Sequence, residues 1–190
     1  MKTLKRFAVT LLALVAPMTA TAGYNVEATM ARDWPAAAGR IAILPSICPP
    51  DFDCASLNET IAEYFYENPD VVTSDAVSQG MIDIGVEYLD EQNRHAVAEA
   101  LGVGSFLQVV VGNASESNTG AMAYPVGGTG LVGINAIQRK QGSLEVRVVS
   151  ADGRLLAKAA GFGESTFRRS SSGVIGRVFD EIYYRLFPGE

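Results

Sequence analysis

Apolar residues gather in short runs separated by longer stretches of mixed polarity, a pattern typical of strands alternating with helices. Turn residues bound four of these runs, which predict strands over 40–45, 70–74, 105–112 and 143–150. Asp152-Gly153 predicts a hairpin turn, which leads into a fifth strand over 154–165. Two strands are therefore expected early in the chain and three in succession near its end.

Helical periodicity fills two intervals between the early strands and the later ones. Ser56 and Glu59 have the spacing of a capping box, so a first helix is expected to begin at Ser56. Ser74-Asp75 is expected to cap a second helix, which ends near Gly85. The residues expected on the inner face of this second helix are Val77, Met81 and Ile82.

Two more helices complete the pattern. A third is predicted from Asp90 to Gly102, where glycine is a typical stop signal. A fourth follows a serine-rich cap, and its apolar face holds Val174, Ile175, Val178, Phe179, Ile182 and Leu186. The order β-α-β-α-α-β-β-β-α predicts an α/β fold, an α+β sandwich with helices covering a mixed β-sheet, as a single domain over residues 40–188.

The first 22 residues have the pattern of a signal peptide. Lys2, Lys5 and Arg6 precede an apolar run of about ten residues, whereas a membrane-spanning helix needs roughly 20. Small residues end this segment before Gly23, which favours cleavage there over an uncleaved anchor helix. We therefore expect a periplasmic protein whose residues 23–39 form a leader strand or linker. A lipid anchor would need cysteine at position 23, so outer-membrane association would depend on other contacts.

The charge of the chain limits its partners. Cleavage after residue 22 would leave 168 residues with 12 basic and 21 acidic side chains, a net charge near −9. A charge of this sign argues against nucleic acid and against anionic lipid bound through a basic patch.

The two cysteines, Cys48 and Cys54, have five residues between them, in a loop that also contains two prolines. This spacing differs from a C-x-x-C redox motif, and two cysteines with a single histidine are too few for a typical zinc site. Because exported proteins meet oxidising conditions, we expect a structural disulfide, with free thiols as the alternative.

No residue pattern predicts catalysis. His95 lies between Glu91 and Glu99 on the expected third helix, an arrangement typical of a solvated ion-pair face. No nucleophile motif accompanies it. Five aspartates lack the spacing of a calcium loop: Asp51, Asp53, Asp70, Asp75 and Asp83. We therefore expect no enzymatic activity, no cofactor and no bound metal.

A glycine-rich hairpin insertion is predicted over residues 113–140. Within it, residues 117–138 contain five glycines and no charged side chain. Three interpretations remain open: a weakly ordered hairpin, a contact with a partner or second copy, and a membrane-inserting hairpin with arms of about ten residues. Pro125 is expected to interrupt one arm. The residues expected at a partner or membrane contact are Tyr124, Val126, Gly127, Gly128, Gly130, Leu131 and Val132.

Four stretches, spread over about residues 40–187, resemble the pattern of a family of envelope domains. They are Ile41–Pro45, Val71–Asp75, Ala98–Gly112 and Val146–Leu156. This pattern is similar to the domain shared by the curli secretion channel, the Pel exopolysaccharide-export lipoprotein, the penicillin-binding-protein activator lipoproteins and the amino-terminal part of TolB. The lipidated cysteine of the lipoprotein members is missing, because Gly23 takes its place.

The resemblance implies a non-enzymatic scaffold that forms rings or docks on envelope machinery. In the curli channel, extended hairpins of such a domain form the outer-membrane part. We therefore expect an exported accessory or scaffold protein of an envelope secretion or assembly apparatus, acting as an oligomer or with protein partners. The alternative expectation is a periplasmic module that binds a small ligand or signal in a cleft at the strand ends.

Overall fold

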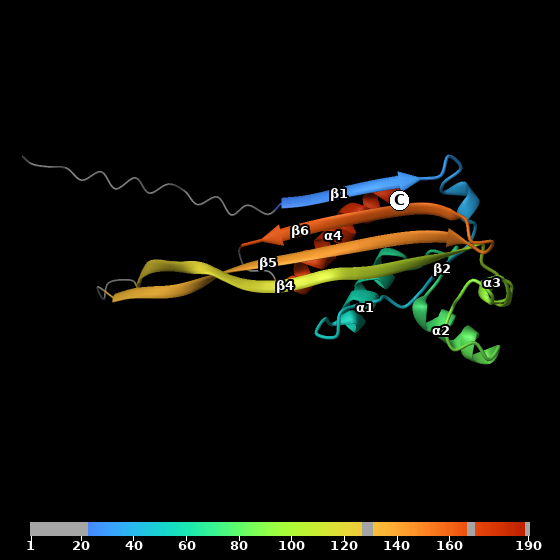
Figure 1. Cartoon of the computed structure of the whole chain (residues 1–190), viewed down its shortest axis with the longest axis horizontal. Coiled ribbons are helices and arrows are strands. Elements are labelled where there is room, and N and C mark those ends of the chain that lie inside the picture. The colour runs from blue at the N-terminus through green and yellow to red at the C-terminus, as the bar shows by residue number, and fades with distance from the viewer. Residues whose placement is uncertain (1–22, 127–130, 167–169, 189–190) are drawn as a thin grey trace, which may run out of the picture.

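The computed structural model describes residues 23–126, 131–166 and 170–188, with side chains outside 119–137. The predicted signal peptide, residues 1–22, lies outside the described residues. The described chain forms a mixed six-stranded sheet in the order β1-β6-β5-β4-β2-β3 (Figure 1). The strands are β1 (Gly23–Met30), β2 (Ile41–Ile43), β3 (Val71–Val72), β4 (Ser105–Val126), β5 (Leu131–Ser150) and β6 (Leu155–Ser165). The α/β class and all five predicted strands are confirmed.

Four α-helices accompany the sheet within the described part of the chain. They are α1 (Cys54–Tyr64), α2 (Ser74–Asp83), α3 (Arg94–Leu101) and α4 (Ser171–Leu186). Strands β2, β3 and the start of β4 run parallel, while β1, β6, β5 and β4 are antiparallel neighbours. No helix in the described residues is both long and apolar enough to cross a membrane.

For residues 23–39 the sequence predicts either a leader strand or a linker. In the structure, the first part of this segment is a strand. β1 pairs with β6 from Gly23↔Glu164 to Met30↔Ala157 and forms one edge of the sheet. Val26 is 5% exposed because it packs into the main core. Residues 23–30 therefore belong to the sheet.

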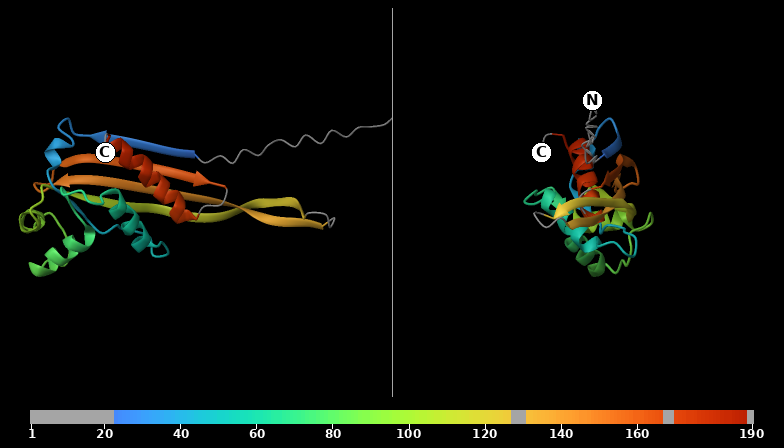
Figure 2. Two further views of the ribbon diagram at one scale, coloured as in Figure 1. Left: turned by 180° about the vertical axis from the view of Figure 1, so that it is seen from behind. Right: turned by 90° about the vertical axis from the view of Figure 1, so that its left-hand side faces the viewer.

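Two hydrophobic cores lie on opposite faces of the sheet. The larger core joins α1 and α4 to alternate residues of the antiparallel strands, such as Leu107, Val109 and Val146. The smaller core joins α2 and α3 to Ala42 and Phe106. Figure 2 shows α1 and α4 lying across the face that is seen from behind. Since α2 and α3 cover only the β2 end of their face, the rest of that face lacks a helix within the described residues.

The predicted starts of three helices are wrong. α1 begins before the expected capping box, because the Asp53 carboxylate accepts a hydrogen bond from the Ser56 amide at 3.1 Å and caps the helix three residues before Ser56. Thr73, not Ser74, is the N-cap residue of α2. The Asp90 carboxylate accepts hydrogen bonds from the amides of Gln92 and Asn93 and forms a turn, so α3 begins only at Arg94.

Glycine marks two predicted turns. Gly102 ends α3 in the left-handed region with φ of 62°, as the sequence predicts. Gly153 adopts φ of 89° in the turn between β5 and β6, in agreement with the predicted hairpin.

Candidate functional site

The loop with both cysteines is a structural element. Cys48 and Cys54 form a disulfide with their Cα atoms 5.9 Å apart, which confirms the expected pairing. The amide of Ile47 donates to the Val109 carbonyl at 2.9 Å, and its own carbonyl accepts from the Val111 amide at 2.8 Å. The disulfide therefore joins a short extension of the sheet to the first residue of α1.

The titratable residues considered for chemistry do not come together. His95 is exposed on α3. Within the described ranges, no three histidine, cysteine, aspartate or glutamate side chains are grouped so that they could hold a metal ion. Asp53, one of the five aspartates considered for calcium, caps α1 instead.

The predicted hairpin insertion is a continuation of the two longest strands. β4 and β5 stay paired from Ser105↔Ser150 to Val126↔Leu131, with register shifts after Val111 and Asn118. β6 follows β5 only as far as Ser165, which lies opposite Lys140. Beyond that point the two strands form a ribbon that projects well past the other elements (Figures 1 and 2). We refer to residues 117–126 and 131–138 as the projecting ribbon.

The contact residues predicted from the sequence lie at the far end of the projecting ribbon. The backbones of Tyr124 and Val126 lie on β4, and those of Leu131 and Val132 on β5. Gly127, Gly128 and Gly130 lie outside the described residues. Pro125 does not interrupt its arm, because it pairs in register with Val132. Each strand of a two-stranded ribbon has a free edge, where the missing N–H of proline is tolerated.

Polar contacts attach the base of the ribbon to the body. The Glu116 carboxylate accepts a hydrogen bond at 3.0 Å from the Ser171 amide in the first turn of α4. Arg139 pairs with Glu164 of β6 at 2.5 Å. The hydrogen bond from Arg139 lowers the pKa of the Glu164 carboxyl. These contacts fix the direction in which the ribbon leaves the sheet.

Ion pairs line the part of the sheet face that lacks a helix. Glu145 pairs with Arg147 on its own strand and with Lys158 on β6 at 3.1 Å. Partial burial alone would raise the pKa of Glu145, but hydrogen bonds from Arg147 and Lys158 outweigh it and lower this pKa. This part of the face therefore carries paired charges of both signs.

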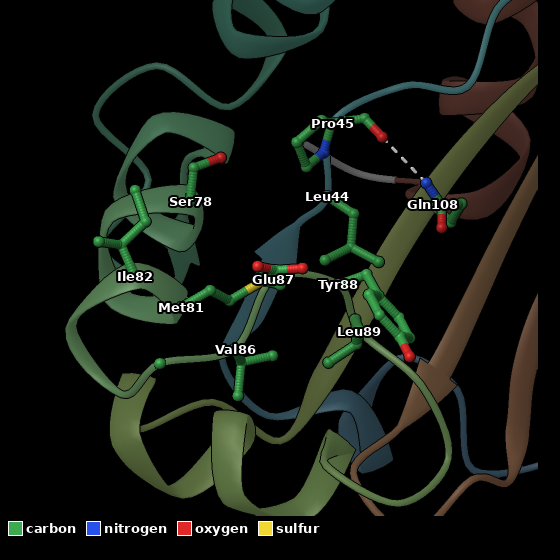
Figure 3. A pocket seen from close by; sticks show the side chains of 11 residues that line it. Leu44, Pro45, Ser78, Met81, Ile82, Val86, Glu87, Tyr88, Leu89 and Gln108 are labelled. Carbon is green, nitrogen blue, oxygen red and sulfur yellow. Dashed lines mark hydrogen bonds between the residues drawn. The ribbon is translucent and has the colours of Figure 1, made fainter.

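A groove lies beside α2, where the sequence predicted only core packing. It has a volume of about 600 Å³ and is bounded by the end of β2, by α2, by the following loop and by Gln108 of β4 (Figure 3). Its apolar lining includes Leu44, Met81, Ile82, Val86, Tyr88 and Leu89. We refer to this hollow as the α2 groove.

Helical periodicity wrongly placed one residue of this groove, Ile82, on the inner face of α2. Val77 is fully buried and Met81 partly buried, as expected, but the side chain of Ile82 is 68% exposed. The available signal was the segment 82–88, in which apolar residues alternate with polar residues and glycine, a period of two that differs from the spacing of a helix face.

Comparisons with known proteins yield likenesses of fold at low identity. No protein-family model and no curated relative matches the chain. The PelC dodecamer from Paraburkholderia phytofirmans is 12% identical, with a TM-score of 0.48 over 86% of this chain and 97% of that chain. Lipoprotein GNA1162 from Neisseria meningitidis is 16% identical, with a TM-score of 0.49 over 78% and 98%. The hypothetical protein CT253 from Chlamydia trachomatis is 12% identical, with a TM-score of 0.43 over 79% and 94%.

Proposed function

We propose that the mature chain is a non-enzymatic accessory or scaffold protein of an envelope secretion or assembly apparatus. In this proposal it acts by self-association or by binding protein partners, and the projecting ribbon makes the contact. The observation that carries the proposal is the position of the ribbon, which extends beyond β6 and pairs with no third strand within the described residues.

The physics of an isolated ribbon supports a contact role. A two-stranded hairpin with no third strand or packed helix is only marginally stable in water. Free strand edges are usually protected by charged residues, yet residues 117–138 contain none. A partner surface, a second copy or an apolar environment that covers the ribbon would satisfy its edges and bury its apolar residues.

The rest of the chain is consistent with a scaffold. The predicted signal peptide directs the protein out of the cytoplasm. The disulfide between Cys48 and Cys54 is typical of an oxidising compartment. The contacts of Glu116 and Arg139 hold the ribbon on the body, so that a partner would meet it in one orientation.

A trimmed variant tests the proposal. Residues 118–138 are replaced by Asn-Gly, so that a two-residue turn connects Ser117 and Arg139, which already face each other across the strands. Light scattering and crosslinking pull-down on the mature protein should show assembly or partner capture, and both should be lost in the trimmed variant. Circular dichroism should show that its fold is kept.

Two results would contradict the scaffold function. One is a mature protein that is strictly monomeric and captures no partner. The other is a trimmed variant that assembles as well as the full chain. Loss of folding in the trimmed variant would show that the ribbon stabilises the domain, and substitution of Val132 by Lys would then test the contact without shortening the strands.

The α2 groove favours a second candidate function, a periplasmic module that binds a small ligand or signal. Its volume of about 600 Å³ falls in the range of small-molecule sites. Thermal-shift screening of the trimmed variant separates the two functions, because a ligand effect there would be independent of the ribbon.

A further inference from the structure

Exposed apolar side chains concentrate beside the α2 groove. Ile82 and Tyr88 are each 68% exposed and Ile84 is 42% exposed, within seven consecutive residues. Single exposed apolar residues are ordinary on protein surfaces, but a group of them at the rim of a hollow is typical of an interaction site. Leu44 and Leu89 extend the apolar lining inward.

Glu87 and Gln108 supply hydrogen-bond acceptors to the groove, beside the hydroxyl groups of Ser78 and Tyr88. Figure 3 shows the Glu87 carboxylate among the lining side chains, and no described residue forms an ion pair with it. Gln108 uses its amide nitrogen to donate to the Pro45 carbonyl at 3.0 Å, which leaves its own carbonyl oxygen to accept. α2 ends at the groove, and the carboxyl end of a helix favours positive charge.

The charge of the groove selects its occupant. Its lining contains a carboxylate but no lysine, arginine or histidine. The last residue of α2, Asp83, and the turn before α3, with Asp90 and Glu91, add acidic residues in sequence. A fitting occupant therefore carries an apolar group together with a positive charge and N–H donors. A second copy of this chain fits poorly, because the mature net charge is near −9.

We propose that the α2 groove binds a short peptide segment of a protein partner, in which an apolar side chain is flanked by lysine or arginine. The apolar side chain lies against Leu44, Met81 and Leu89, the basic group pairs with Glu87, and a peptide N–H donates to Gln108. The groove is open to solvent, which suits a chain that enters and leaves it. This surface is separate from the projecting ribbon.

Titration of the mature protein with three peptides tests the site. The probes are acetyl-KLFLK-amide, its acidic counterpart acetyl-ELFLE-amide, and acetyl-KSGSK-amide, which lacks the apolar residues. Calorimetry should detect binding of the first peptide only, weakening as salt is raised. Amide chemical-shift changes should map to Leu44, to residues 78–89 and to Gln108.

Matched variants locate the interaction. Tyr88→Ser should weaken binding of the first peptide about tenfold, because an aromatic rim residue loses its contact area. Tyr66→Ser is its control, since Tyr66 is 78% exposed but lies outside the groove, and it should leave affinity unchanged. Glu87→Gln should remove most of the salt dependence, whereas Glu59→Gln on α1 should not.

Several outcomes would overturn the peptide site. They are no binding of the first peptide up to about 1 mM, equal binding of the acidic peptide, and chemical-shift changes away from the groove. Binding of octylamine without binding of the peptide would assign the groove to a small ligand instead. The trimmed variant should bind the peptide as well as the full chain does, so a failure of the ribbon contact and a failure of this site are distinguishable.

Discussion

Small residues along β6 allow α4 to lie directly against the sheet. A Cβ atom added at Gly161 would lie 2.5 Å from a Val178 methyl carbon and 3.0 Å from Val26. Both valines are buried, so neither can move aside without disturbing the core. Gly176 lies on the same helix, but an added Cβ there would meet no atom within 4 Å. Two glycines that look alike in the sequence therefore have opposite structural requirements.

We expect Gly161→Val to lower the free energy of unfolding by about 1–3 kcal/mol, because overpacking forces strain into the β6–α4 interface. Gly176→Ala should instead raise it by about 0.5–1 kcal/mol, because alanine restricts the unfolded chain in an open helical position. Urea denaturation of both variants measures the two changes. Equal effects of the same sign would contradict this account of the interface.

The ion pairs of Glu145 predict a pH dependence. Because its folded-state pKa lies below the ordinary value of 4.5, Glu145 contributes stability fully above pH 4.5. This contribution is lost as the pH falls through the folded-state pKa. Glu145→Gln should therefore cost about 0.2–1 kcal/mol at pH 7 in low salt, and little at pH values below that pKa. Urea denaturation at both pH values measures the difference, and Glu59→Gln is the control. If the loss of stability in Glu145→Gln were larger at low pH than at pH 7, the direction assigned to the pKa shift of Glu145 would be wrong.

At the scale of elements, the start of α1 depends on the disulfide loop before it. The loop continues the sheet at Ile47, closes through Cys48 and Cys54, and places Asp53 at the helix N-terminus. Helical periodicity alone locates this helix but not its first residue, because several side chains near position 54 are able to cap. The loop geometry determines which of them reaches a free amide.

Asp53→Ala should lower the free energy of unfolding by about 1 kcal/mol, because the Ser56 amide loses its acceptor. Ser56→Ala should change it by less than about 0.5 kcal/mol, since this residue does not cap the helix. Thermal unfolding of the oxidised protein checks both variants. If Ser56→Ala lowered the free energy of unfolding more than Asp53→Ala, Ser56 would be the capping residue, as the sequence pattern predicts.

At the scale of the whole molecule, residues far apart in the chain share one core. The Trp34 indole donates to the Leu186 carbonyl at 2.7 Å, and its ring meets Phe187 edge to face with centroids 5.3 Å apart. β1 pairs with β6, and α4 packs across β1, β5 and β6. The first and last described elements therefore depend on each other, so unfolding of either exposes the same core.

Trp34, the single tryptophan of the chain, reports on this junction. We expect its fluorescence and the far-ultraviolet circular dichroism to change together in one urea transition, as in a two-state domain. In the trimmed variant the fluorescence and the circular dichroism should still change together, because the projecting ribbon lies outside the core. A fluorescence transition at clearly lower urea would show that the segment before β2 unfolds independently.

The sequence by itself determined the order of the elements from residue 40 onward and the inner faces of most of them. Alternation in 143–150 and helical spacing in 174–186 record which side of a strand or helix is buried, and that information is local. It also predicted the pairing of Cys48 with Cys54, with free thiols as the alternative, and the structure has the disulfide.

Only the tertiary structure decided what depends on distant neighbours. β1 is a strand because β6 offers an edge, and Gly161 is required because Val178 lies above it. The ribbon projects because β6 ends before β4 and β5 do. The α2 groove combines β2, α2, a loop and β4, so no single window of sequence contains it. Local periodicity reports whether a residue faces inward, whereas the neighbour that covers it comes from packing.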